Sequence, residues 1–174
     1  MSYSRRLRAN NHIHMTRSAI ESVRKENNIK YEQFHEFGKL EWQSVYHQLS
    51  QIFVPRGVYP DGRTLYQCWK YWEEDYEVLY AGENYLDDLN FIIPSHDKVV
   101  LLAEEGSYGR KEYWLYEGYV DAVYRIIHEA ALYNYMIASK KYNWILAETQ
   151  EGFLYGKGEP VVSNMISLSK RKKR

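Results

Sequence analysis

The sequence predicts an α+β fold in which helices come first and a mostly antiparallel sheet follows, within a single domain over residues 1–174. Helical apolar spacing dominates the part before residue 55. Short aromatic and β-branched runs separated by turn residues dominate the part after residue 90. One amphipathic helix at about 119–132 interrupts these runs, and we expect it to pack on a face of the sheet.

The chain begins with polar and basic residues 1–12, which we expect to be a disordered tail. A short helix is predicted from Thr16 or Ser18, because Ser18 and Glu21 have the spacing of a capping box. We expect Asn27-Asn28 to end this helix.

A stronger helix is predicted next, ending before Pro55. Gly38 lies inside its pattern and favours a kink or a break. The apolar face of this helix comprises Phe34, Trp42, Val45, Leu49 and Ile52, with Phe37 at its edge.

The pattern of residues 63–90 does not decide between helix and strand. Leu65, Cys68, Trp69 and Trp72 have helical spacing, whereas Tyr76, Val78 and Tyr80 alternate as a strand does. The apolar run at 91–93 before Pro94 favours another short strand.

The sheet proper is predicted from residue 98 onward. Residues 98–103 (KVVLLA) are apolar after the lysine, which is typical of a strand covered on both faces. We expect a hairpin between this strand and the aromatic run at 113–116. Further strands are predicted at 135–138, 144–147 and 153–155, and residues 165–174 (ending SKRKKR) are expected to be disordered. The helix predicted at about 119–132 has an apolar stripe formed by Val120, Val123, Tyr124, Ile127 and Ala131.

Composition narrows the class of protein. Lysine and arginine total 23 and balance 23 acidic residues, so overall charge does not favour nucleic acid as a partner. The lone Cys68 excludes an intrachain disulfide and suits a reducing compartment. No apolar run approaches the roughly 20 residues of a membrane span, and no secretory signal follows Met1, so we expect a cytoplasmic protein without membrane contact.

Residues capable of catalysis or metal binding are scattered. His12 and His14 have no acidic residues near them that would complete a metal site, and no cofactor motif occurs. Neither a metal nor a cofactor is therefore expected. One alternative function is a small enzyme in which His96, Glu104 and Glu117 converge in a cleft. Another is an RNA-associated protein that uses Lys140, Lys141 and the C-terminal lysines.

The segment from Glu73 to Asp88 carries seven acidic residues and no basic one, with aromatic residues between them. Carboxylates accelerate association with a basic partner, and buried aromatics anchor such a contact. We therefore predict that this segment binds a protein, such as a toxin domain with a basic cleft. The predicted contact residues are Trp72, Glu73, Glu74, Asp75, Tyr76, Glu77, Glu83, Tyr85, Asp87 and Asp88, with Tyr71 and Tyr80 among the interleaved aromatics.

The segment WLYEG (Trp114 to Gly118), the helix after it and SKKYNWILAE (Ser139 to Glu148) resemble an uncharacterised family of small bacterial α+β proteins. That family looks like the immunity proteins of polymorphic-toxin systems, which neutralise a cognate toxin by binding it. The resemblance covers about residues 114–148. It implies a non-catalytic binding function, and it carries over no catalytic residue.

Overall fold

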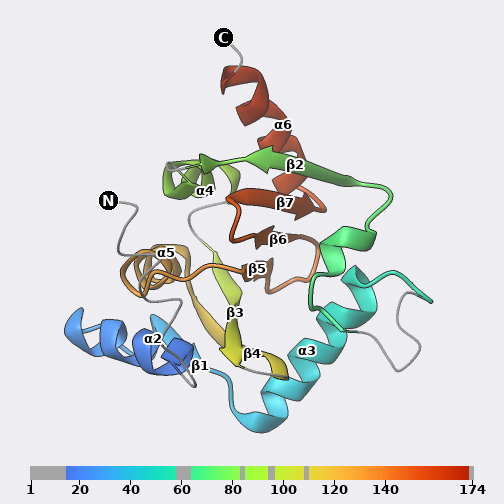
Figure 1. Ribbon diagram of the computed structural model, residues 1–174. Helices are drawn as coiled ribbons and strands as arrows, with labels where there is room; N and C mark the ends of the chain where they lie inside the picture. The colour runs from blue at the N-terminus through green and yellow to red at the C-terminus, as the bar shows by residue number, and fades with distance from the viewer. Residues whose placement is uncertain (1–14, 58–63, 83–84, 94–96, 108–109, 173–174) are drawn as a thin grey trace.

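The computed structural model describes residues 15–57, 64–82, 85–93, 97–107 and 110–172. Their strands form one antiparallel seven-stranded sheet in the order β1-β4-β3-β5-β6-β7-β2 (Figure 1). The strands are β1 (Phe34–Glu36), β2 (Tyr76–Tyr80), β3 (Lys98–Ser107), β4 (Arg110–Tyr119), β5 (Tyr135–Ser139), β6 (Ile145–Glu148) and β7 (Phe153–Lys157). The helices are α2 (Met15–Glu26), α3 (Lys39–Phe53), α4 (Tyr85–Ile92), α5 (Val120–Glu129), α6 (Val161–Lys172) and the 3-10 helix η1 (Cys68–Tyr71).

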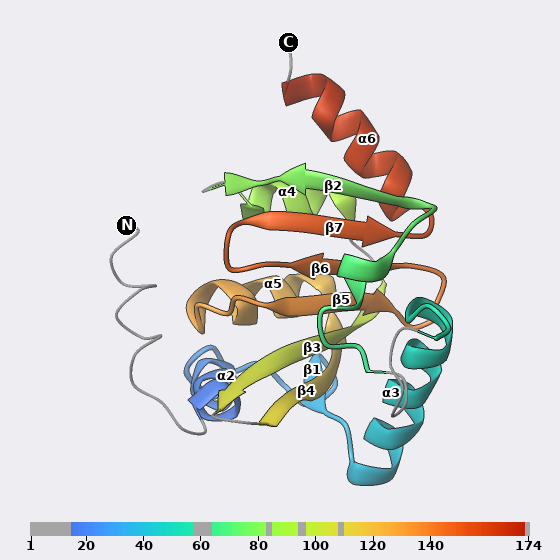
Figure 2. The same cartoon turned by 45° about the vertical axis from the view of Figure 1, so that its right-hand side comes forward.

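The two faces of the sheet carry separate apolar cores. One core joins residues of α2, α4, α5 and α6 to the sheet, and it includes Leu101, Ile137 and Leu146. The other joins α3 and the segment around η1 to the opposite face, and it includes Val100 and Leu102. Figures 1 and 2 show α3 on the side of the sheet away from α2 and α5. The alternation of Leu101 and Leu102 between the two cores follows from the two-residue period of a strand.

The predicted α+β class is confirmed, as are the antiparallel sheet and the helix on one of its faces. That helix is α5, whose side chains Val120, Val123 and Ile127 are at most 1% exposed. The apolar run at 98–103 is covered on both faces as predicted, since it contributes to both cores.

The helix predicted through Phe34 is wrong at its start. Residues 34–36 form strand β1, with Phe34 opposite Gly118 of β4, and α3 begins only after Gly38 as its N-cap. A Cβ atom at Gly118 would lie 2.6 Å from the Phe34 ring, so the glycine makes room for Phe34 against the sheet. The break expected at Gly38 is therefore confirmed, whereas Ile52 is 52% exposed and does not belong to the buried face.

The strand predicted at 91–93 is wrong, because Phe91 and Ile92 end helix α4. Leu89 and Ile92 are fully buried on one side of this helix, and Tyr124 of α5 donates a hydrogen bond to the Leu89 carbonyl at 2.7 Å. A three-residue apolar run is compatible with either structure, so only the tertiary contact decides. The alternating pattern at 76–80 does form a strand, β2.

The two ends of the chain differ from expectation in different ways. Residues 165–172, predicted to be disordered, belong to α6, which packs on β7 and α4. Lys172 pairs with Asp88 at 2.5 Å, and the Arg171 guanidinium lies 4.4 Å from the Phe91 ring centre. The expected N-terminal tail, residues 1–12, lies outside the described residues. Helix α2 ends before Asn27 as predicted but begins at Met15, so Ser18 is inside the helix and is not its N-cap.

Candidate functional site

The end of the sheet formed by β7 and β2 is covered unevenly. Five of the ten large apolar side chains that are exposed among the described residues lie here. Clusters of exposed aromatic side chains are typical of interaction sites. We call this region the β2 surface, and its apolar members are Tyr71, Tyr76, Val78, Tyr80 and Phe153.

The alternation of β2 explains why its side chains divide between two environments. Val78 lies opposite Tyr155 and Tyr80 opposite Phe153, all on the face that α3 occupies farther along the sheet. Leu79 points to the other face and is 7% exposed in the core that includes α6. Tyr80 is 62% exposed. The pattern YEVLY thus places aromatic and apolar groups on the poorly covered face.

Ring contacts connect the aromatic members across three elements. The ring centres of Tyr80 and Phe153 lie 5.2 Å apart, those of Trp72 and Tyr76 6.3 Å, and those of Trp69 and Tyr155 6.2 Å. Such distances are within the range of favourable aromatic pairs. Tyr76 lies against the buried Trp72, and Tyr80 and Phe153 lie against each other, so the surface is organised in advance of any partner.

Acidic groups border the aromatic members. Glu73, Glu74 and Asp75 are exposed in the turn before β2, and Glu77 is half-buried within the strand. Two lysines lie among them. Lys157 donates to the Glu74 carbonyl at 2.5 Å, and Lys70 donates to the Gln67 side chain at 2.7 Å. Glu77 points to the other face of β2, with Leu79, so the border has three carboxylates against two ammonium groups and a net negative charge.

Three of the predicted contact residues point inward. Trp72, Tyr85 and Asp88 are 4%, 8% and 5% exposed. The Trp72 indole donates to the Phe53 carbonyl at 2.8 Å, which attaches the η1 segment to α3, and Asp88 pairs with Lys172. These side chains support the fold and are not available at a surface.

The remaining predicted contacts divide between the β2 surface and other places. Tyr76 lies on the same face of β2 as Tyr80, and Glu73, Glu74 and Asp75 are exposed in the turn that precedes it, whereas Glu77 points to the opposite face. Asp87 is exposed on α4, a helix of the opposite face, and Glu83 lies outside the described residues. Sequence reasoning missed Phe153, which reaches the surface only because β7 pairs with β2.

The residues of the hypothetical enzyme site do not gather where the structure describes them. Glu117 pairs with Lys98 at 3.2 Å and with Lys140. Burial favours a higher pKa for Glu117, but the hydrogen bonds and charges of the two lysines outweigh it and lower the pKa below its usual value. Glu104 lies four residues along β3 from Val100, the cross-strand neighbour of Glu117, which is a separation of about 13 Å. His96 lies outside the described residues.

Two of the lysines of the hypothetical RNA site take part in the fold, whereas Lys141 and Lys170 are exposed. Lys140 pairs with Glu117, and Lys172 with Asp88. Arg171 lies over the Phe91 ring. Lys140, in the turn after β5, and Lys172 and Arg171, on α6, are thus engaged by carboxylates or an aromatic ring.

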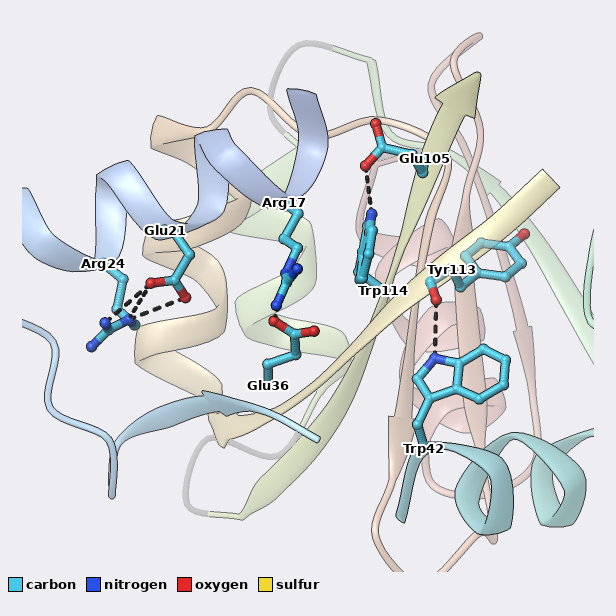
Figure 3. A network of polar contacts seen from close by, with 8 residues as sticks. All are labelled: Arg17, Glu21, Arg24, Glu36, Trp42, Glu105, Tyr113 and Trp114. Atoms are coloured by element: carbon cyan, nitrogen blue, oxygen red, sulfur yellow. Dashed lines mark hydrogen bonds and ion pairs between the residues drawn. The ribbon is translucent and has the colours of Figure 1, made fainter. Parts of the chain in front are cut away.

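A polar network attaches α2 to the sheet (Figure 3). Arg17 pairs with Glu36 at 2.8 Å, and its guanidinium lies 4.8 Å from the Trp114 ring centre. The Trp114 indole donates to Glu105, which also accepts the Thr16 backbone N–H. On the other face, Trp42 of α3 donates to the Tyr113 carbonyl at 3.1 Å. These groups satisfy one another, and we assign them to the scaffold.

Two shallow grooves flank α5, with volumes of about 350 and 360 Å³. The first lies against α4 and includes Tyr124, Arg125 and His128, and the second lies against α2. Within the described part of the chain, no group of three histidine, cysteine or acidic side chains could hold a metal ion. Cys68 is buried in the α3-side core, and burial raises the pKa of its thiol to about 12.

The fold and this surface define an α+β protein with a single antiparallel sheet, closed by helices on one face and only partly closed on the other. The chain belongs to the DUF6756 family, a family of unknown function, which matches residues 13–169 and therefore every strand of the sheet. No curated protein and no solved structure matches the chain. Of the helices that the structure describes, none combines the length and the apolar character that crossing a membrane requires.

Proposed function

We propose that this protein is a non-catalytic binding protein of the immunity type, which neutralises a bacterial toxin by placing its β2 surface in the toxin's basic cleft. The observation that carries the proposal is the exposed aromatic group of Tyr76, Tyr80 and Phe153 bordered by Glu73, Glu74 and Asp75. The resemblance of residues 114–148 to a family similar to immunity proteins points to the same function.

The two kinds of side chain contribute differently to such a complex. Each aromatic side chain can bury about 150–250 Å² and anchors the contact once it is desolvated. The carboxylates lie at the border, where they raise the association rate with a basic partner and oppose mismatched ones. A toxin that acts on a phosphate backbone has a basic cleft, and this surface is complementary to it in charge.

Neutralisation by this route requires no bond to be made or broken. The bound protein fills the cleft and excludes the toxin's substrate. The function also assigns the protein to the compartment in which the toxin acts, the bacterial cytoplasm.

The test compares two charge reversals that change net charge equally. The double variant Glu74→Lys with Asp75→Lys alters the β2 surface, and Glu26→Lys with Glu32→Lys alters exposed positions around α2. The partner is the protein captured from native cells, with the product of a large upstream toxin gene as the first candidate. Stopped-flow association is measured at low and at high salt.

We expect the β2 variant to lower the association rate constant about tenfold at low salt, with a smaller loss at high salt. The control variant should change it by less than about twofold, because its charges lie away from the contact. Equal rate constants for the two variants would remove the β2 surface from the interface.

A further inference from the structure

Strand β2 is the last strand of the sheet, and no strand of the described residues lies beyond it (Figure 2). The backbone groups on its outer side can be identified from two hydrogen bonds. The Ala81 N–H donates to the Gly152 carbonyl at 3.0 Å, which places Ala81 on the side of β2 that faces β7. Backbone groups of successive residues in a strand point to opposite edges. Leu79 and Glu77 therefore face β7 as well, and Tyr76, Val78 and Tyr80 face outward.

The pairing on the far side of β7 gives the same answer independently. The Thr149 N–H donates to the Phe153 carbonyl at 2.9 Å, so Phe153 faces β6. Leu154 then faces β2, where its cross-strand neighbour is Leu79. Leu79 and Leu154 thus form a hydrogen-bonded pair, and Val78 does not bond to β7.

The same three residues therefore present both backbone and side chains. Tyr76, Val78 and Tyr80 direct their N–H and C=O groups to the outer edge, and their side chains are 37%, 37% and 62% exposed. Natural proteins usually block a sheet edge with lysine, proline or a bulge. The sequence of β2 is Tyr-Glu-Val-Leu-Tyr, and it contains neither lysine nor proline.

We propose that the partner binds by adding an extended strand to the outer edge of β2, an inference that rests on the proposed function and specifies its binding mode. Main-chain hydrogen bonds to residues 76, 78 and 80 then supply affinity, and alternate side chains supply specificity. The edge has the five-residue length of β2, which is typical of a paired strand.

The arrangement of β2 determines the side chains of the added strand. Partner residues opposite Tyr76, Val78 and Tyr80 lie on the aromatic face, so they are apolar or aromatic. Partner residues between these lie on the face of Glu77, and Glu73, Glu74 and Asp75 directly precede the strand, so these partner residues are basic. The partner segment therefore alternates apolar and basic residues. Charge disfavours a second copy of this chain as the occupant, since its own edge carries Glu77 and the same three acids.

The probe for a test is the peptide Lys-Val-Lys-Tyr-Lys-Val-Lys, added to the full-length ¹⁵N-labelled protein. Two further peptides have the same side chains and charge. One is N-methylated at both valines, whose N–H groups would face β2, and the other at the two inner lysines, whose N–H groups would face away. The readouts are the dissociation constant and the hydrogen-exchange rates of the β2 amides.

We expect the unmodified peptide to slow exchange at Tyr76, Val78 and Tyr80 by at least about tenfold, while Glu77 and Leu79 are protected with or without it. Methylation at the valines should weaken binding by at least about tenfold, because it removes hydrogen bonds to the edge. Methylation at the inner lysines should have much less effect.

Other outcomes contradict strand addition in different ways. If all three peptides bind equally without edge protection, and Glu74→Lys with Asp75→Lys weakens each, strand addition is wrong and the β2 surface remains the binding site. If none of the peptides binds, strand addition by a basic segment is wrong, and the rate measurement with the captured partner decides the proposed function separately. Protection that rises with protein concentration in the absence of peptide would identify a second copy as the occupant and overturn the inference.

Discussion

The centre of the sheet and its β2 end are built from the same kind of strand pairing but are covered differently. In β3, residues 99–103 are at most 1% exposed, and every residue of β5 and β6 is buried. In β2 only Leu79 is buried, while Tyr76, Val78 and Tyr80 are exposed. The strands of both regions are hydrogen-bonded within the sheet. They differ in whether one or both faces of the strands are covered by other elements.

The cause of the difference is the distribution of helices. Four α-helices pack on one face, and on the other the described chain provides only α3 and the short η1 segment. The second face is thus closed over the centre of the sheet and open toward β2. We infer that the centre supplies stability and the β2 end supplies binding, and four predictions test this division.

The largest effect is expected at the centre. Replacing Leu102 by alanine removes a fully buried side chain from the α3-side core, and such cavities cost about 2–5 kcal/mol. The matched change Val78→Ala, on the same face at the β2 end, should cost less than about 1 kcal/mol, because this side chain is 37% exposed. Urea unfolding of both variants measures the difference, and similar losses would contradict the division.

The next effect concerns the covered face of the β2 end. A Cβ atom at Gly156 would lie 2.4 Å from the Met165 sulfur and 2.6 Å from Val161, so Gly156→Ala should force α6 away from β7. Overpacking of this kind costs about 1–3 kcal/mol. The double variant with Met165→Ala should lose less than the sum of the two single losses, as measured by a double-mutant cycle. Strict additivity would show that α6 does not pack closely on Gly156.

A smaller effect is expected from Glu117, whose pKa is lowered in the folded protein by Lys140 and Lys98. A depressed pKa contributes stability above the unfolded pKa of about 4.3, and this contribution is lost as pH falls through the folded pKa. The stability advantage of the wild type over Glu117→Gln should therefore shrink as pH falls from about 6 to about 3. Thermal unfolding at several pH values measures this advantage. A difference that is constant with pH would show that the ion pairs do not stabilise the fold.

The smallest effect on stability is expected at Tyr80. Because its side chain is 62% exposed, Tyr80→Ala should change the free energy of unfolding by less than about 0.5 kcal/mol. The same variant should weaken partner binding by at least about tenfold, as loss of an aromatic anchor does. Tyr31→Ala is the control, since Tyr31 is 65% exposed elsewhere and should change neither quantity. Unaltered binding by Tyr80→Ala would separate this residue from the interface.

The sequence predicts correctly those elements whose burial depends on local spacing, and it fails where contacts between distant residues decide the structure. Residues 98–103 and the α5 stripe from Val120 to Ile127 indicate their burial through spacing alone, and both predictions are confirmed, whereas Ala131 lies beyond the end of α5 and is only half-buried. The predictions for Phe34 and for the run at 91–93 are wrong, because pairing with β4 makes Phe34 part of a strand and packing on α5 makes residues 91 and 92 part of helix α4. Residues 165–174 have the composition of a tail, yet their apolar residues Met165 and Leu168 are buried in α6.

The candidate site was predictable only in part for the same reason. The acids and tyrosines of 73–80 are contiguous, and their grouping was visible in the sequence. The burial of Trp72 and Asp88 was not visible in the sequence, because their partners Phe53 and Lys172 lie 19 and 84 residues away. The position of Phe153 beside Tyr80 was not visible in the sequence either, because it depends on the pairing of β7 with β2.

The most direct test of the central claim is hydroxyl-radical footprinting of the aromatic residues with and without the captured partner. The account predicts that oxidation of Tyr76, Tyr80 and Phe153 falls on binding, while Tyr31 and Tyr119, which are 65% and 47% exposed, react as before. Protection of Tyr31 or Tyr119 with undiminished oxidation at β2 and β7 would contradict it.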